Sequence, residues 1–368
     1  MLRKSRKLLI IALAISALGY FGYKFRNSIT LEGFHWSLVG ESLRHAHVSL
    51  LVLSLVTIYG CFAIRALRWM RFSRGFGRLK FSNVYPATLM GFTCTFLLGR
   101  AGEPIRPVLI GKKDSVSIPG MFGVYVLERV SDMAATAVLA VMALLFFKGH
   151  GAAGSSNPVV TKARSAGELL VVGVIFVIGF LVYFRYHGAD WLSRRLQHPS
   201  WHEGWRGKIV ALLEGFSEGL QGIRTWGDLG ALVGYTALHW FLVACCYLWI
   251  SNGFGGRLGD LTLADSILVL VFGMLGSAVQ LPGVGGGAQI ATFLTFTLFF
   301  KIDQSSAAVT SIMIWLITFA GCCLVGLPLL FREGWSMGEL RQMAVSAEKD
   351  AENMALSGEL PEPGEKRP

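Results

Sequence analysis

Charged side chains stand inside two apolar stretches of the sequence, where they could bind an anionic group. The first is Gly99–Pro107, which reads GRAGEPIRP and directly follows an apolar run. The second is the apolar run 118–147, which contains Glu128, Arg129 and Asp132. A charge at bilayer depth costs about 2.5–3.5 kcal/mol by some scales, so such residues are rare and usually functional. Guanidinium groups suit phosphate because their planar fork can donate two hydrogen bonds at once.

The composition predicts a polytopic membrane protein. Of the 368 residues, 53% are hydrophobic and only 15% are charged, whereas about 25% is typical of soluble chains. The net charge of +11 is therefore attributed to cytoplasmic lysines and arginines and to attraction for anionic headgroups, and no nucleic-acid partner is expected. The cysteines lie in apolar runs without a C-x-x-C pair, which argues against disulfides and metal ligation. We expect no metal and no cofactor.

An all-α membrane helix bundle with about six full spans and two re-entrant hairpins accounts for the apolar runs. The spans are expected in 8–23, 48–64, 118–147, 169–184, 229–250 and 306–331, and the hairpins in 83–112 and 262–300. The six basic residues in 65–80 are interpreted as a cytoplasmic loop, with Trp69 as an interfacial anchor. Most other lysines and arginines then also face the cytoplasm, which places both termini there in an inner or plasma membrane.

Several segments complete this domain, 1–331. The run 8–23 is interpreted as an uncleaved helix, with a signal peptide as the alternative. Residues 148–167 form an external Gly/Ser-rich loop. Residues 201–224 form an amphipathic helix, either on the cytoplasmic membrane face or packed under the bundle. Residues 332–368 form a largely disordered cytoplasmic tail.

The two predicted hairpins enter from opposite sides, which is the arrangement of inverted repeats in transporters. Their tips are Gly99–Pro107 and Leu281–Gly287. The second tip is either an anion site at the helix terminus near Gly287 or a simple tight turn. The charges of the first hairpin and of 118–147 either bind a headgroup or form a self-neutralising ion-pair network. His239 is interpreted as a hydrogen-bonded packing residue, with proton coupling as the alternative.

Three motifs in this order resemble the lysylphosphatidylglycerol synthase transmembrane region family of flippase-like proteins. They read LGRAGEPIR at 98–106, ERVSD at 128–132 and LPGVGGG at 281–287. The resemblance covers roughly residues 8 to 331 and implies an integral membrane protein that handles lipids, here without the aminoacyl transferase domain of fused members. Gln289 stands near the place where the family usually has a glutamate, which puts proton or cation coupling at that hairpin in doubt.

A lipid transporter that binds an anionic or zwitterionic membrane lipid is the favoured function, and an enzyme is not. Arg100, Arg106 and Arg129 would contact the headgroup, and Glu103, Glu128 and Asp132 would orient them. The hairpin positions that complete the predicted site are Gly99, Gly102, Pro282, Gly283, Gly285, Gly286, Gly287 and Gln289. One alternative is an intramembrane lipid transferase with two of these carboxylates as acid and base. The other is an accessory subunit of a lipid-synthesis enzyme, docked through 65–80 and 201–224.

Overall fold

The computed structural model describes residues 40, 44, 46–146, 225–277, 279–281, 283, 285–335, 338–339 and 342. Several predicted features lie outside these residues: the run 8–23, the loop 148–167, the span 169–184, the amphipathic helix 201–224, Pro282 and most of the tail after Trp335.

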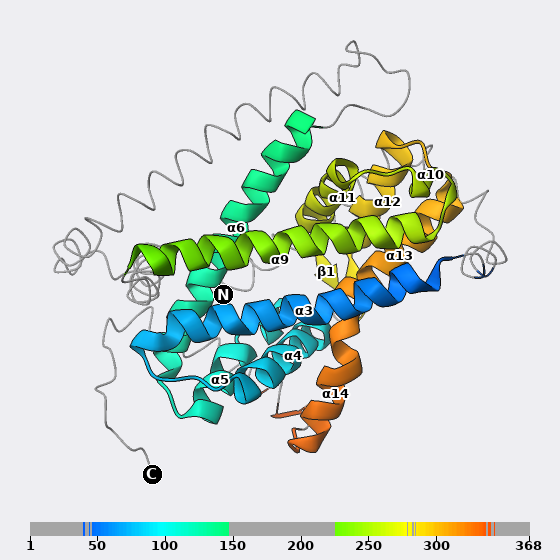
Figure 1. Cartoon of the computed structure of the whole chain (residues 1–368). Coiled ribbons are helices and arrows are strands. Elements are labelled where there is room, and N and C mark those ends of the chain that lie inside the picture. Colours follow the sequence, from blue (N-terminus) through cyan, green and yellow to red (C-terminus); the bar gives the residue numbers. More distant parts are fainter. Residues whose placement is uncertain are drawn as a thin grey trace, which may run out of the picture.

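Two long antiparallel helices, α3 (Val48–Phe72) and α9 (Trp226–Gly253), form the frame of the described bundle (Figure 1). Both ends of the pair are fixed. At one end the backbone N–H of His47 donates to the carbonyl of Gly253 at 2.7 Å. At the other, Arg71 Nη2 lies 2.7 Å from Asp228 Oδ1, and the same carboxylate caps the start of α9.

Helix α3 corrects one prediction from the sequence. The predicted span ended at residue 64 and a basic loop followed, but the helix continues to Phe72 and then into the short 3-10 turn η2 (Ser73–Gly75). Arg65 and Arg68 are buried inside the bundle. Trp69 is fully buried and is no interfacial anchor. The helix continues because carboxylates on another helix neutralise these arginines, as described below.

The chain then turns back on itself in a first helix hairpin. It consists of α4 (Phe81–Leu98), the 3-10 turn η3 (Gly99–Gly102) and α5 (Ile105–Asp114). Its open end is closed by Asp114, which accepts hydrogen bonds from the backbone of Lys80 at 3.1 Å and from Asn83 at 2.6 Å. Glycine is needed in the turn because Gly99 has a φ of +66°. The 29-residue helix α6 (Ile118–Phe146) follows.

A second helix hairpin follows α9 and the short helix α10 (Gly256–Gly259). Its arms are α11 (Leu263–Gly276) and α12 (Gly287–Phe299), and its tip is a two-stranded ribbon of β1 (Gln280–Leu281) and β2 (Gly285–Gly286). The arms touch at two glycines, since a Cβ on Gly276 or on Gly287 would lie 2.2 Å from the carbonyl oxygen of the other. A side chain at either position would force the arms apart.

The two hairpins open toward opposite ends of the α3–α9 pair. The first opens near the end of α3, where Phe76 packs on Gly120. The second opens near the end of α9, where Arg257 on α10 donates to the carbonyl of Lys301 at 2.9 Å. Their tips meet, because the N–H of Gly283 donates to the carbonyl of Phe96 at 2.8 Å. The helical hairpins lie where the sequence places them, while their re-entrant position in a membrane and an inverted repeat remain predictions.

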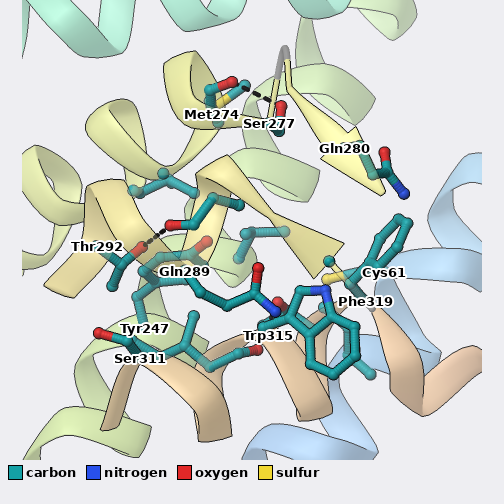
Figure 2. A pocket seen from close by; sticks show the side chains of 18 of the residues that line it. Cys61, Tyr247, Met274, Ser277, Gln280, Gln289, Thr292, Ser311, Trp315 and Phe319 are labelled. Atoms are coloured by element: carbon teal, nitrogen blue, oxygen red, sulfur yellow. Dashed lines mark hydrogen bonds between the residues drawn. The ribbon is translucent and has the colours of Figure 1, made fainter. Parts of the chain in front are cut away.

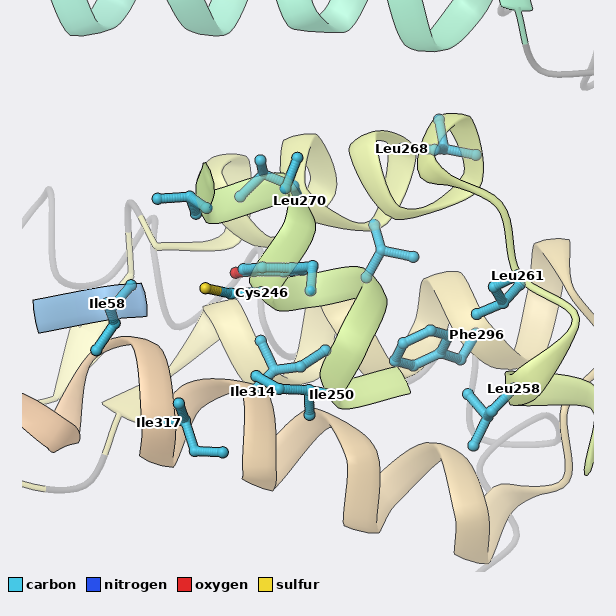
Figure 3. Close-up of a cluster of buried hydrophobic side chains, with 14 of the residues drawn as sticks. Ile58, Cys246, Ile250, Leu258, Leu261, Leu268, Leu270, Phe296, Ile314 and Ile317 are labelled. Atoms are coloured by element: carbon cyan, nitrogen blue, oxygen red, sulfur yellow. The ribbon is translucent and has the colours of Figure 1, made fainter. Parts of the chain in front are cut away.

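The last described helices, α13 (Gln304–Thr318) and α14 (Cys323–Arg332), are joined by the 3-10 turn η5 (Ala320–Cys322). The expected span 306–331 therefore consists of two helices joined by this turn, not of one continuous helix. Buried hydrophobic side chains from α9, α11, α12 and α13 pack together and fix the second hairpin to the frame (Figure 3). Among the described residues, three stretches are long and apolar enough to cross a membrane, namely Val48–Gly75, Trp226–Gly253 and Gln304–Arg332. The predicted number of six spans remains a prediction.

Candidate functional site

Glu128 is the centre of a buried charge network that joins α3, α5 and α6. Its Oε1 accepts hydrogen bonds from Arg65 Nη1 and Arg68 Nη2, each at 2.7 Å. Its Oε2 accepts from Trp69 Nε1 and Arg106 Nη1, each at 2.8 Å. Only 1% of the glutamate is exposed. Three cations and an indole therefore surround a single carboxylate, and both of its oxygens are occupied.

Asp132 is the second buried carboxylate of the network. It lies one helical turn after Glu128 on the same face of α6, as the spacing of four predicts. It accepts from Arg65 at 3.0 Å and from both terminal nitrogens of Arg68 at 3.0 and 3.1 Å. Arg68 also donates to Thr236 on α9 at 3.0 Å. The network thus ties α6 to both helices of the frame.

Arg106 connects the first hairpin to this network. Its guanidinium lies over the ring of Trp69, 4.3 Å from the centroid, an arrangement in which the ring face attracts a cation. Gly91 makes room for it, because a Cβ there would lie 2.6 Å from Arg106 Cβ. Glu128 accepts a hydrogen bond from one terminal nitrogen of Arg106, Nη1. The other two nitrogens of Arg106, Nε and Nη2, are buried and have no hydrogen-bond partner among the described residues.

The remaining predicted charges form a looser, partly exposed edge. Arg129 lies 3.7 Å from Asp132 and 3.9 Å from Glu103, and 38% of its side chain is exposed. The hydroxyl of Tyr125 donates to Glu103. Arg100 is exposed on the hairpin turn and forms no ion pair within the described residues. The structure therefore brings five of the six predicted charged residues together and leaves Arg100 outside.

Positive charge exceeds negative charge in this network. The described residues in it are the arginines Arg65, Arg68, Arg106 and Arg129 and the carboxylates Glu103, Glu128 and Asp132. Four cations face three anions, so one positive charge is left over. An anionic ligand would complete the balance, because buried charges are normally paired. The network is thus ion-paired in large part, as the alternative interpretation proposed, but the described residues alone do not neutralise it.

A cavity of about 220 Å³ lies beside the network, between the tip of the second hairpin and helices α3, α9 and α13 (Figure 2). Arg65 and Phe92 line it, and the Arg65 guanidinium lies 5.3 Å from the centroid of the Phe92 ring. Arg65 is therefore shared between the cavity and the two buried carboxylates. Gln289, Thr292 and Trp315 are among the side chains that line it (Figure 2).

The glycine-rich tip of the second hairpin forms one wall of this cavity through Gly285 and Gly286. Gln289 Oε1 accepts from the N–H of Gly286 at 2.5 Å, and the N–H of Gly287 donates to Val279 at 2.8 Å. These two amides are therefore occupied and are not available to the anion site that was one of the two alternatives for this helix terminus. The observed geometry is that of a capped tight turn, and the amide of Gln289 supplies the cap.

Two residues of the site differ from their sequence-based interpretation. His239 is buried, as expected of a packing residue, and it lines the cavity, but among the described residues its Nδ1 has no hydrogen-bond partner, so the expected hydrogen bonding is not found at that nitrogen. Arg65 was assigned to a cytoplasmic loop together with Arg68. The spacing of three between these arginines places both on one helix face, and this was the available signal. Within the described chain, no three His, Cys, Asp or Glu side chains gather as metal ligands would.

Apolar helices of membrane-crossing length around a buried charge network define an integral membrane protein of the helical class. The chain belongs to the family described as lysylphosphatidylglycerol synthase TM region, whose model matches residues 7–326. This match confirms the family resemblance seen in the three motifs and is compatible with a lipid-related role. No curated protein and no solved structure matches the chain.

Proposed function

We propose that the protein moves an anionic membrane lipid between leaflets and holds the headgroup with arginines of the charge network. The observation that carries this proposal is the excess of one cation over the carboxylates in a largely buried cluster. Family membership supports a lipid as the ligand. Arg129 is the main headgroup contact, because it is the most exposed arginine in the network and its ion pairs are the longest. Arg100, on the adjacent turn, is the second.

The geometry gives less support to an intramembrane transferase. A general acid or base must exchange a proton with the substrate and so needs an accessible oxygen. Both oxygens of Glu128 are already hydrogen-bonded, to three arginines and an indole. Asp132 accepts from two arginines. These carboxylates are placed to hold cations in position, which is their role in the transport proposal.

The geometry also weakens the proposal of an accessory subunit that docks through residues 65–80. Arg65 and Arg68 are buried in the charge network and are not available to a partner. Arg74, Arg78 and Lys80 are exposed and leave a smaller basic surface than the sequence indicated. A docking role would therefore depend on these three residues and on segments beyond the described residues.

Lipid movement in reconstituted vesicles tests the proposal. The full chain is placed in phosphatidylcholine vesicles with a trace of acyl-labelled phosphatidylglycerol, and loss of inner-leaflet label to an external quencher is followed. Arg129→Ala should slow movement at least tenfold, because a hydrogen bond to a charged group contributes about 1.5–3 kcal/mol. Arg74→Ala is the matched control, since this arginine is exposed and lies outside the network.

Glu103→Gln is the second test variant, because it removes the carboxylate that faces Arg129 across 3.9 Å. We expect it to slow movement by a smaller factor than Arg129→Ala. Full activity of both variants with phosphatidylglycerol, phosphatidylserine and cardiolipin analogues would refute the assignment of this site. Absence of movement with the unmodified chain would refute transport of these lipids.

A further inference from the structure

We infer that the acidic C-terminal segment 336–368 docks on an exposed basic surface of its own chain, at the end of the bundle where α3 ends and the first hairpin opens. We name this surface, made of Arg78, Lys80 and Lys112, the basic end; all three residues are exposed. It lies outside the charge network and outside the cavity, so the docking does not depend on the transport proposal. The continuity of the surface, its charge, the course of the chain after α14 and the charge of the segment carry the inference.

The basic end is one continuous surface, although its residues come from two parts of the chain. The backbone N–H of Lys80 donates to Asp114 at 3.1 Å, and Asp114 lies two residues after Lys112 at the end of α5. A Cβ on Gly77 would lie 2.7 Å from Val116 Cγ1, so the stretch before α4 packs against the turn after α5. The three cations therefore surround a single contact between these two stretches.

The positive charge of the basic end is not balanced within the described part of the chain. None of its three side chains forms an ion pair there, and the carboxylates nearby have other partners. Asp228 pairs with Arg71, and Glu333 pairs with Lys113. Asp114 accepts two hydrogen bonds from the start of α4. An acidic partner would complete the balance, since exposed charges attract one another over about 8 Å at physiological ionic strength.

The chain turns toward the basic end as soon as α14 ends. Gly334 has a φ of +75°, and the N–H groups of Gly334 and Trp335 donate to the carbonyls of Phe331 and Leu330 at 3.0 and 3.1 Å. These are the two hydrogen bonds of a Schellman motif, which ends a helix and redirects the chain. The Lys112 ammonium then lies 5.8 Å from the centroid of the Trp335 ring. Segment 336–368 therefore starts beside the basic end.

Segment 336–368 carries the opposite charge. It contains seven acidic and four basic residues, and Glu348, Asp350 and Glu352 lie close together in it. Glu348 is 13 positions after Trp335, and an extended chain advances up to about 3.3–3.6 Å per residue, which is long enough to cross the surface. A tethered segment also has an effective concentration on the order of millimolar. An anionic bilayer would attract the same cations, but it does not account for the turn of the chain onto Lys112.

Zero-length cross-linking of the purified full chain in phosphatidylcholine nanodiscs tests the docking. A water-soluble carbodiimide joins lysine amines to carboxylates that contact them, and mass spectrometry of the peptides identifies the pairs. We expect Lys80 and Lys112 to be joined to carboxylates of 336–368. The pair Lys113–Glu333 is the positive control, because the two side chains are in contact. Lys301, exposed at the opposite end of the bundle, should not be joined to the segment.

Electrostatic docking has to weaken when salt is added or a neighbouring cation is removed. The Debye length falls from about 10 Å at about 0.1 M salt to about 3 Å at about 1 M, so the yield at Lys80 and Lys112 should fall at least about threefold. Arg78→Gln should lower it about two- to fivefold, although the reagent does not act on arginine. Arg44→Gln is the matched control. Arg44 is also exposed and lies three residues before His47, at the opposite end, so the yield should not change.

Three outcomes would overturn the docking. The first is a yield at Lys301 equal to that at Lys112, or a yield that Arg78→Gln leaves unchanged. The second is found by mixing isotope-labelled and unlabelled chains, because products that join two copies would make the segment of a second copy the partner. The third is loss of the products in phosphatidylglycerol nanodiscs, which would make the bilayer surface the partner of the basic end. Lipid movement is measured separately, so its absence leaves the docking standing.

Discussion

Replacing Glu128 with glutamine is the most direct test of the charge network. The substitution preserves the shape of the side chain and removes its charge. Arg106 would then lose its only carboxylate partner within the described residues, and Arg65 and Arg68 would share Asp132 alone. Breaking a buried ion pair by removing one partner costs about 3–5 kcal/mol, because it leaves an uncompensated charge. Three arginines surround Glu128, so we expect the free energy of unfolding to fall by an amount in this range.

Thermal unfolding in detergent measures this loss. A thiol-reactive dye is a suitable probe because Cys61, Cys94 and Cys246 are at most 1% exposed in the folded protein. A change of 1 kcal/mol shifts Tm by about 2–4 °C in domains of 150–250 residues. This chain has 368 residues, so its Tm shift per kcal/mol is at or below the lower end of that range, about 2 °C. Glu128→Gln should therefore lower Tm by about 6–10 °C.

Glu333→Gln is the matched control for this measurement. Glu333 pairs with Lys113 at the surface, where the two side chains are 30% and 22% exposed, and surface ion pairs contribute only about 0–1 kcal/mol. Its Tm should stay within about 2 °C of the unmodified chain. Adding Arg106→Met to Glu128→Gln should recover part of the lost stability, since the unpaired cation is removed. A Glu128→Gln protein that melts together with the Glu333→Gln control would refute the network as a stabilising element.

Three further predictions concern the hairpins and the frame. Gly102→Ala should destabilise the folded state by about 3 kcal/mol or prevent folding, because its Cβ would lie 2.3 Å from a carbonyl oxygen of α4. The control is Gly60→Ala, which adds a methyl group on open helix surface. In the same melting assay it should be neutral or stabilise by up to about 1 kcal/mol. Cysteines at Lys112 and at Lys301 should be labelled by an impermeant maleimide from opposite sides of a vesicle, and labelling from one side would contradict opposed hairpins. Asp228→Ala should cost about 1–2 kcal/mol, measured by Tm, because it removes the N3 half of the capping box and the ion pair with Arg71, and an unchanged Tm would mean that neither contributes much.

Local patterns in the sequence were sufficient to find the hairpins. Glycines and prolines interrupt two apolar runs, and the interruptions are the turns at Gly99–Gly102 and Gln280–Gly286. The shared face of Glu128 and Asp132 follows from helical periodicity alone. These features depend on residues close together in the chain, which is why the sequence predicts them.

The partners of these carboxylates could not be found in the same way. Arg65 and Arg68 are 60 to 67 residues away in the chain, and counting basic residues as topology markers assigned them to a loop. Trp69 was assigned to the membrane interface for the same reason, although it donates to Glu128 inside the bundle. The cavity also depends on contacts between distant elements, and no local pattern indicates that His239 and Gln280 line the same space.

The long separation between the arginines of α3 and their carboxylates has a consequence for biosynthesis. A chain that grows at about 5–20 residues per second completes α3 several seconds before Glu128 and Asp132 are synthesised. Arg65 and Arg68 lie in the last third of α3, so during this interval each would have to enter the bilayer unpaired at a cost of up to about 2.5–3.5 kcal/mol, the value for a helix centre. We therefore expect stable insertion of α3 to wait for α6, so that the two helices enter as a pair. Loss of either carboxylate would then appear first as failed insertion and low yield in the cell.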